Sequence, residues 1–70
     1  MQALSKAAPG SICTIKWMFG VPEILSFLRS RQIREGSEIQ VIQNCGSGMI
    51  IGKGQKRYMI AMEAAERIQV

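Results

Sequence analysis

The sequence predicts a mainly β fold, a small antiparallel barrel of about five strands with one α-helix between the first and second strands. Two observations lead to this fold class. The apolar spacing changes from helical steps before Gly36 to the two-residue step of a half-buried strand after it. Three apparent strands then follow through short connections that contain glycine, which favours antiparallel neighbours and excludes parallel crossovers.

Length and composition indicate one folded domain over residues 1–70. Apolar residues make up 47% of the chain and charged residues 20%, which is typical of a globular domain. The net charge of +4 favours an acidic partner, such as nucleic acid, an anionic membrane surface or another protein, or else serves solubility. Residues 1–10 lack a signal-peptide pattern and no apolar run could span a bilayer, so we expect a cytoplasmic protein with reduced thiols.

The first part of the chain predicts a lead-in segment and a strand. Residues 1–8 carry Leu4 as their large apolar side chain, and Pro9-Gly10 then forms a turn. Apolar and polar residues alternate over Ser11–Met18, which predicts the first strand. In this strand we expect the side chains of Cys13, Ile15 and Trp17 to point inward.

A helix is predicted from Pro22 to about Arg31. Proline suits the first helical position, and Glu23 complements the positive end of the helix dipole. Arg29 and Arg31 lie in the last turn, where cations are favourable. Gly36 follows, and a glycine there can adopt a positive φ that reverses the chain into the next strand.

The second half of the chain predicts an antiparallel meander. Its strands are Glu38–Gln43, Gly48–Gly52 and Lys56–Met62, followed by a helical turn at Met62–Glu66 and a last strand at Arg67–Val70. We expect Ile39, Val41, Ile68 and Val70 to point inward. Closure into a barrel of the SH3 kind would limit exposed strand edges, and an open sheet with the helix on one face is the alternative.

The order and spacing of these packing and turn residues resemble the FeoA family of ferrous-iron-transport accessory domains over nearly the whole chain. The matching residues are Leu4, Pro9-Gly10, Leu28, Ile33, Gly36, Ile39-x-Val41-Ile42 and Ala65-x-x-Ile68-x-Val70. The chain departs from the family at three positions. The family usually has an apolar residue in place of Arg31, glycine in place of Gln32 and proline in place of Glu35.

The resemblance implies a single FeoA-like, SH3-like domain that binds and modulates FeoB, a membrane transporter for ferrous iron with a cytoplasmic GTPase domain. Domains of this type are also similar to the C-terminal module of iron-dependent repressors. Because no DNA-binding domain precedes the module here, we expect the transporter accessory rather than the regulator.

Residues for catalysis or cofactor binding are scarce. Histidine and aspartate are absent, and the glycines of residues 46–48 and 52–54 lack the following helix of a phosphate loop. The family is linked to transition metal ions, but two cysteines separated by 31 residues form no ligand pair. We therefore expect no enzyme activity, cofactor or metal site, with Cys13 as a core thiol and Cys45 in an exposed turn.

The expected function is therefore binding of another macromolecule. We predict a partner surface that combines the exposed side of the helix with its flanking loops, formed by Phe19, Phe27, Arg31 and Arg34. The alternative is a nucleic-acid-binding barrel, in which basic and aromatic side chains contact phosphates and stack on bases. The basic residues for that role form two sets, Arg29, Arg31 and Arg34 at the helix end and Lys53, Lys56 and Arg57 around the last hairpin, and the aromatic residues are Trp17, Phe19 and Tyr58.

Overall fold

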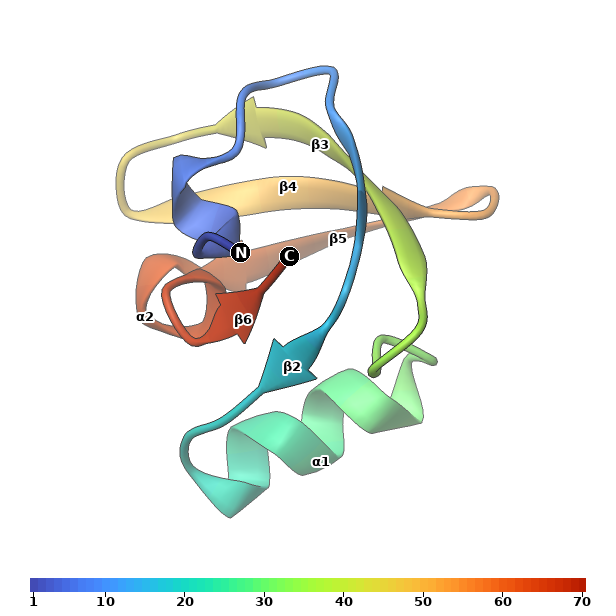
Figure 1. Ribbon diagram of the computed structural model, residues 1–70, viewed down its shortest axis with the longest axis vertical. Helices are drawn as coiled ribbons and strands as arrows, with labels where there is room; N and C mark the ends of the chain where they lie inside the picture. Colours follow the sequence, from blue (N-terminus) through green and yellow to red (C-terminus); the bar gives the residue numbers. More distant parts are fainter.

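The computed structural model describes all residues, 1–70, as six strands with three short helical segments (Figure 1). In chain order the elements are η1 (Leu4–Lys6), β1 (Ile12–Thr14), β2 (Trp17–Met18), α1 (Pro22–Ser30), β3 (Glu38–Asn44), β4 (Gly48–Lys53), β5 (Lys56–Ala61), α2 (Met62–Ala65) and β6 (Ile68–Gln69). The predicted mainly β fold, with a helix after the first strand and a helical turn before the last, is confirmed. No helix is both long enough and apolar enough to cross a membrane.

The strands form two antiparallel sheets. One sheet has the order β1-β3-β4-β5, and the other pairs β2 with β6. The predicted meander is the β3-β4-β5 part of the first sheet, with boundaries within one residue of those expected. In Figure 1, β2 and β6 lie below this sheet, and α1 lies beyond β2 at the lower end of the molecule.

One core of 13 buried apolar residues lies between the two sheets and the helices. Ile39 and Val41 of β3 and Ile68 of β6 are buried in it, as predicted, whereas Val70 is only half-buried. Leu4 of the lead-in segment is also fully buried, because η1 packs over α2 and β6. No polar or charged residue is buried, so the core is stabilised by apolar burial alone.

The segment predicted as one strand, Ser11–Met18, divides in two where the chain changes sheets. The N–H of Ile15 donates to Ser37 O on the β3 side at 2.8 Å, whereas the N–H of Lys16 donates to Gln69 O beside β6 at 2.8 Å. This change of partner strand shifts the alternation of inward-facing and outward-facing side chains by one residue. Met18 therefore points into the core in place of Trp17.

The inward position predicted for Trp17 is consequently wrong, since 54% of this residue is exposed. Ile15 is buried as expected, and Cys13 is half-buried against the core. A strict two-residue alternation holds only while a strand keeps one partner, and β1 and β2 have different partners.

Helix α1 ends in a Schellman motif. The N–H of Gln32 donates to Arg29 O at 3.0 Å, and the N–H of Ile33 donates to Leu28 O at 2.9 Å. Leu28 and Ile33 are both buried in the core, which gives the apolar contact that accompanies this motif. The helix thus ends at a point set by core packing.

The motif requires a left-handed residue, and Gln32 supplies it with φ of 64°. An L-residue in this region is strained, and the family's usual glycine would not be. Gly36, in the same exit loop, has φ of 90°, as the sequence predicts. An added Cβ at Gly36 would meet no atom within 4 Å, so glycine is needed there for its backbone conformation only.

We predict that Gln32→Gly stabilises the protein by about 0.5 to 1 kcal/mol. Relief of left-handed strain contributes about 1 to 2 kcal/mol, and the greater freedom of glycine in the unfolded chain offsets about 0.4 to 1 kcal/mol. Urea denaturation measures the change. Gly36→Ala is the matched control and should destabilise by about 1 kcal/mol or more; equal effects of the two variants would contradict this account.

Leu28→Ala should remove a large fraction of the stability of the domain and lower its melting temperature strongly. Replacing a fully buried leucine by alanine costs about 2 to 5 kcal/mol, and a chain of 70 residues has a total stability of only about 4 to 10 kcal/mol. Thermal denaturation followed by circular dichroism tests this. Phe27 is adjacent and exposed, so Phe27→Ala should leave the melting temperature within a few degrees of that of the parent. A similar loss of stability in both variants would show that the burial of Leu28 is not the cause of its effect.

Candidate functional site

The exposed side of α1 carries an aromatic residue beneath a cation. Phe27 is 44% exposed, and the guanidinium carbon of Arg31 lies 4.7 Å from the centre of its ring. Residues four apart are neighbours on a helix surface, so the spacing itself brings this pair together. The contact is a cation-π interaction that holds the arginine over the ring while both remain accessible.

An apolar groove of about 240 Å³ lies beside this pair, between α1 on one side and β5 with α2 on the other. Ile24, Phe27 and Leu28 line it from the helix, and Ile60, Ala61 and Ala64 line it from the opposite wall. Glu23 is its one charged residue. An apolar groove with charge at its rim is suited to receive an apolar side chain of another protein.

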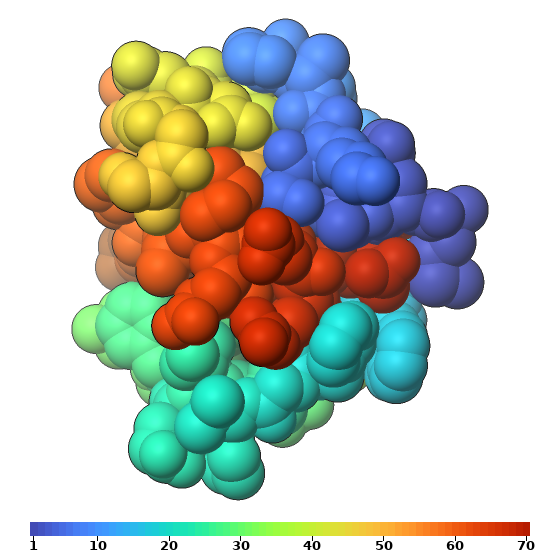
Figure 2. Space-filling model, turned by 90° about the vertical axis from the view of Figure 1, so that its left-hand side faces the viewer, coloured from blue at the N-terminus to red at the C-terminus, as the bar shows by residue number.

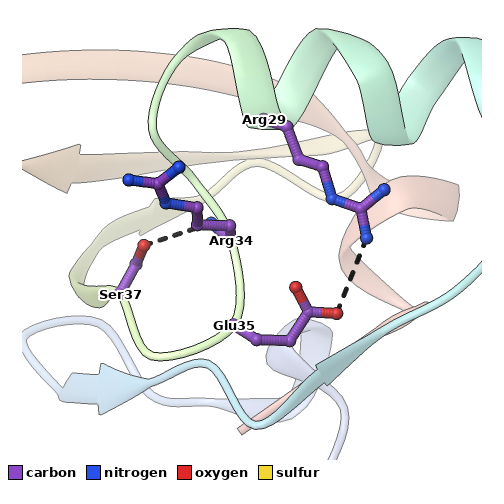
Figure 3. Close-up of polar contacts among 4 residues, drawn as sticks. All are labelled: Arg29, Arg34, Glu35 and Ser37. Atoms are coloured by element: carbon purple, nitrogen blue, oxygen red, sulfur yellow. Dashed lines mark hydrogen bonds and ion pairs between the residues drawn. The ribbon is translucent and has the colours of Figure 1, made fainter.

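The exit loop of α1 is held by polar contacts (Figure 3). Arg29 Nη2 lies 3.7 Å from Glu35 Oε2, and the N–H of Arg34 donates to Ser37 Oγ at 3.1 Å. The Ser37 hydroxyl in turn donates to Gln32 O at 2.9 Å. In Figure 3 the guanidinium of Arg34 points away from the Arg29–Glu35 pair, so this cation is available to a partner.

The structure brings together two of the four residues predicted for the partner surface. Phe27 and Arg31 are in contact, whereas Phe19 precedes the start of α1 and Arg34 follows its end. The helix has nine residues and is therefore about 13 Å long, so Phe19 and Arg34 flank the pair from opposite ends.

Phe19 instead pairs with Trp17, a residue that the sequence interpretation placed in the core. Their ring centroids are 4.9 Å apart and the ring planes are inclined by 32°. The signal that could have found this pair was Met18, an apolar residue out of phase with the strand and next to Trp17.

The residues considered for nucleic-acid binding are brought together only in part, since Arg34 and Lys53 line one surface hollow. Lys53, Lys56 and Arg57 surround the turn between β4 and β5, which Figure 1 shows projecting away from β2 and its Trp17. Tyr58 is half-buried and packs against the core. The cations of this turn therefore lie apart from the aromatic pair.

Potential metal ligands are dispersed. No group of three or more His, Cys, Asp or Glu side chains is placed to hold a metal ion. Cys13 is half-buried in β1, and Cys45 is exposed in the turn between β3 and β4. The absence of a cofactor remains a prediction.

Sequence comparison now decides the family. The model of the FeoA domain matches residues 2–70, almost the whole chain. The chain belongs to the FeoA family. The resemblance stated from single residues is therefore confirmed, and the family is linked to ferrous iron transport.

Solved structures support this assignment. An iron uptake regulatory protein (FeoA) is 28% identical and superposes with a TM-score of 0.84, over 94% of this chain and 89% of that protein. Iron(II) transport protein A from Clostridium thermocellum is 23% identical with a TM-score of 0.86, over 97% of this chain and 43% of that one. No curated protein matches the sequence.

The same fold occurs in a larger regulator. A manganese-dependent transcriptional repressor is 17% identical with a TM-score of 0.86 over 96% of this chain, which spans only 39% of the repressor. At this identity the likeness shows the fold alone. The expected SH3-like architecture agrees with these neighbours.

Cys45 should form an intermolecular disulfide on air oxidation, because its thiol is exposed in a turn. We expect a covalent dimer on a non-reducing gel that disappears in Cys45→Ser and on adding reductant. Cys13→Ser is the matched control and should leave the dimer intact, since Cys13 is less accessible. A dimer that survives in Cys45→Ser would contradict the prediction.

Proposed function

We propose that this protein is a non-catalytic cytoplasmic accessory domain of ferrous iron uptake, which binds a FeoB-type membrane GTPase transporter and modulates it. The observation that carries the proposal is the exposed Phe27–Arg31 pair at the rim of an apolar groove, in a chain of the FeoA family. Aromatic residues and arginine are enriched among the side chains that dominate protein interfaces.

The groove supports a partner with an apolar anchor, and the cations at the C-terminal end of α1 support acidic side chains on that side of the anchor, away from Glu23. Six of the seven residues that line the groove are apolar. Insertion of an apolar side chain of the partner would therefore be favourable, because it removes apolar surface from contact with water. Arg31 and Arg34 have no carboxylate partner within the chain, and the net charge is +4. Complementary acidic groups would speed association and orient the partner.

The proposal predicts that Phe27→Ala weakens binding to the cytoplasmic domain of the FeoB-type transporter from the same organism by about tenfold or more, since it removes one wall of the groove. Reversal of both Arg31 and Arg34 to Glu should also weaken binding and slow association, most strongly at low salt. Titration calorimetry and surface plasmon resonance measure these effects. Both variants should keep the parent circular dichroism spectrum.

Met59→Ala is the matched control for these variants, because it removes an exposed apolar side chain from β5. It should leave the affinity within about twofold of the parent, as expected for a position outside the interface. Unchanged affinity in Phe27→Ala and in the double reversal would place the interface elsewhere. Failure of the parent chain to bind the transporter domain would contradict the proposed partner.

A further inference from the structure

We infer that Trp17, Phe19 and Val21 form an aromatic patch that docks the protein on an anionic lipid surface. The three residues are 54%, 40% and 46% exposed, in a chain that buries 14 other apolar residues almost completely. Trp17 and Phe19 flank buried Met18, and their rings contact each other on the outer side of the segment. Val21 follows two residues later, after Gly20, whose φ of 130° ends the alternation. This patch lies outside the groove proposed for the protein partner.

The patch is supported by backbone pairing on its inner side. Trp17 pairs with Gln69 in the β2–β6 sheet, and the N–H of Phe19 donates to Arg67 O at 3.1 Å. In Figure 2 the cyan segment of β2 lies against the red C-terminal residues and the teal start of α1. The exposed rings are therefore presented from paired backbone and need little reordering on binding.

The shape of the patch favours insertion over reception of a partner side chain. None of the three hollows on the protein surface is lined by Trp17, Phe19 or Val21. The patch therefore offers no pocket to a partner side chain. Tryptophan and phenylalanine rings partition into the boundary between lipid headgroups and acyl chains, where an apolar ring can be buried without a matching cavity.

Cations beside the patch favour lipids with anionic headgroups. Lys16 is exposed next to Trp17, and the Arg67 side chain passes so close to Gly20 that an added Cβ there would lie 2.8 Å from Arg67 Cδ. Arg67 donates to the Glu63 backbone carbonyl, and neither cation has a carboxylate partner. The acidic residues nearest to the patch along the chain are Glu23, which lines the groove beside Phe27, and Glu66, which is next to Arg67. Each such cation strengthens attachment to an anionic surface.

Stacking on nucleic-acid bases is less consistent with this geometry. The two rings already contact each other at 4.9 Å, so each covers part of a face that a base would need. Insertion into lipid uses the outer edges of both rings together, which the paired arrangement leaves exposed.

The single tryptophan of the chain makes the inference testable with vesicles alone. Titration with vesicles of equal parts phosphatidylglycerol and phosphatidylcholine should shift Trp17 emission to shorter wavelength and sediment the protein with the lipid. Phosphatidylcholine vesicles should do neither, and added salt should weaken binding to the anionic vesicles. Because no transporter is present, this outcome is independent of the proposed function.

Variants separate the apolar and electrostatic parts of this binding. Phe19→Ala should weaken sedimentation with the anionic vesicles by about tenfold, and Lys16→Gln by about fivefold. Met59→Ala, which removes an exposed apolar residue from the other sheet, should bind as the parent does. Circular dichroism confirms that each variant is folded.

Three results would overturn the inference. The first is no sedimentation of the parent with anionic vesicles at low salt. The second is equal binding by the parent and Phe19→Ala. The third is a shift of Trp17 emission by a single-stranded oligonucleotide but not by the vesicles, which would assign the patch to nucleic acid.

Discussion

The exchange of hydrogen-bond partners at Ile15 and Lys16 is the constraint on which the rest of the structure depends. Ile15 accepts from the N–H of Gly36 and donates to Ser37 O, both at 2.8 Å, which ties the exit loop of α1 to the first sheet. One residue later the chain pairs with Gln69 and begins the second sheet. Because one segment contributes a strand to each sheet, a chain of only 70 residues can enclose a core between the two sheets. The same change of partner turns Trp17 outward.

The exit of α1 concentrates the departures from the family pattern, and each has a structural counterpart. Arg31, where an apolar residue is usual, lies over the Phe27 ring. Gln32, where glycine is usual, adopts the left-handed conformation that the Schellman motif requires. Glu35, where proline is usual, lies beside Arg29 in an exposed ion pair, which contributes under about 1 kcal/mol. These three side chains make the surface of the loop more polar than the usual family residues would.

We propose different contacts for the two exposed apolar features because their shapes differ. The groove beside Phe27 is concave and needs a partner with a protruding side chain, which only another folded protein or peptide presents in a defined position. The patch of Trp17, Phe19 and Val21 is exposed and lines no hollow, and a soft lipid boundary can accept it without a complementary shape. The net charge of +4 favours anionic partners at both features.

Local physics in the sequence determined the helix, the three-stranded meander, the positive φ at Gly36 and the adjacency of Phe27 and Arg31, since each follows from residues a few positions apart. Tertiary structure decided what depends on pairing between distant segments. Trp17 is exposed because β2 pairs with β6, about 50 residues later in the chain, and not with β3. The groove likewise exists only where α1 meets β5 and α2, so no local pattern could have indicated it.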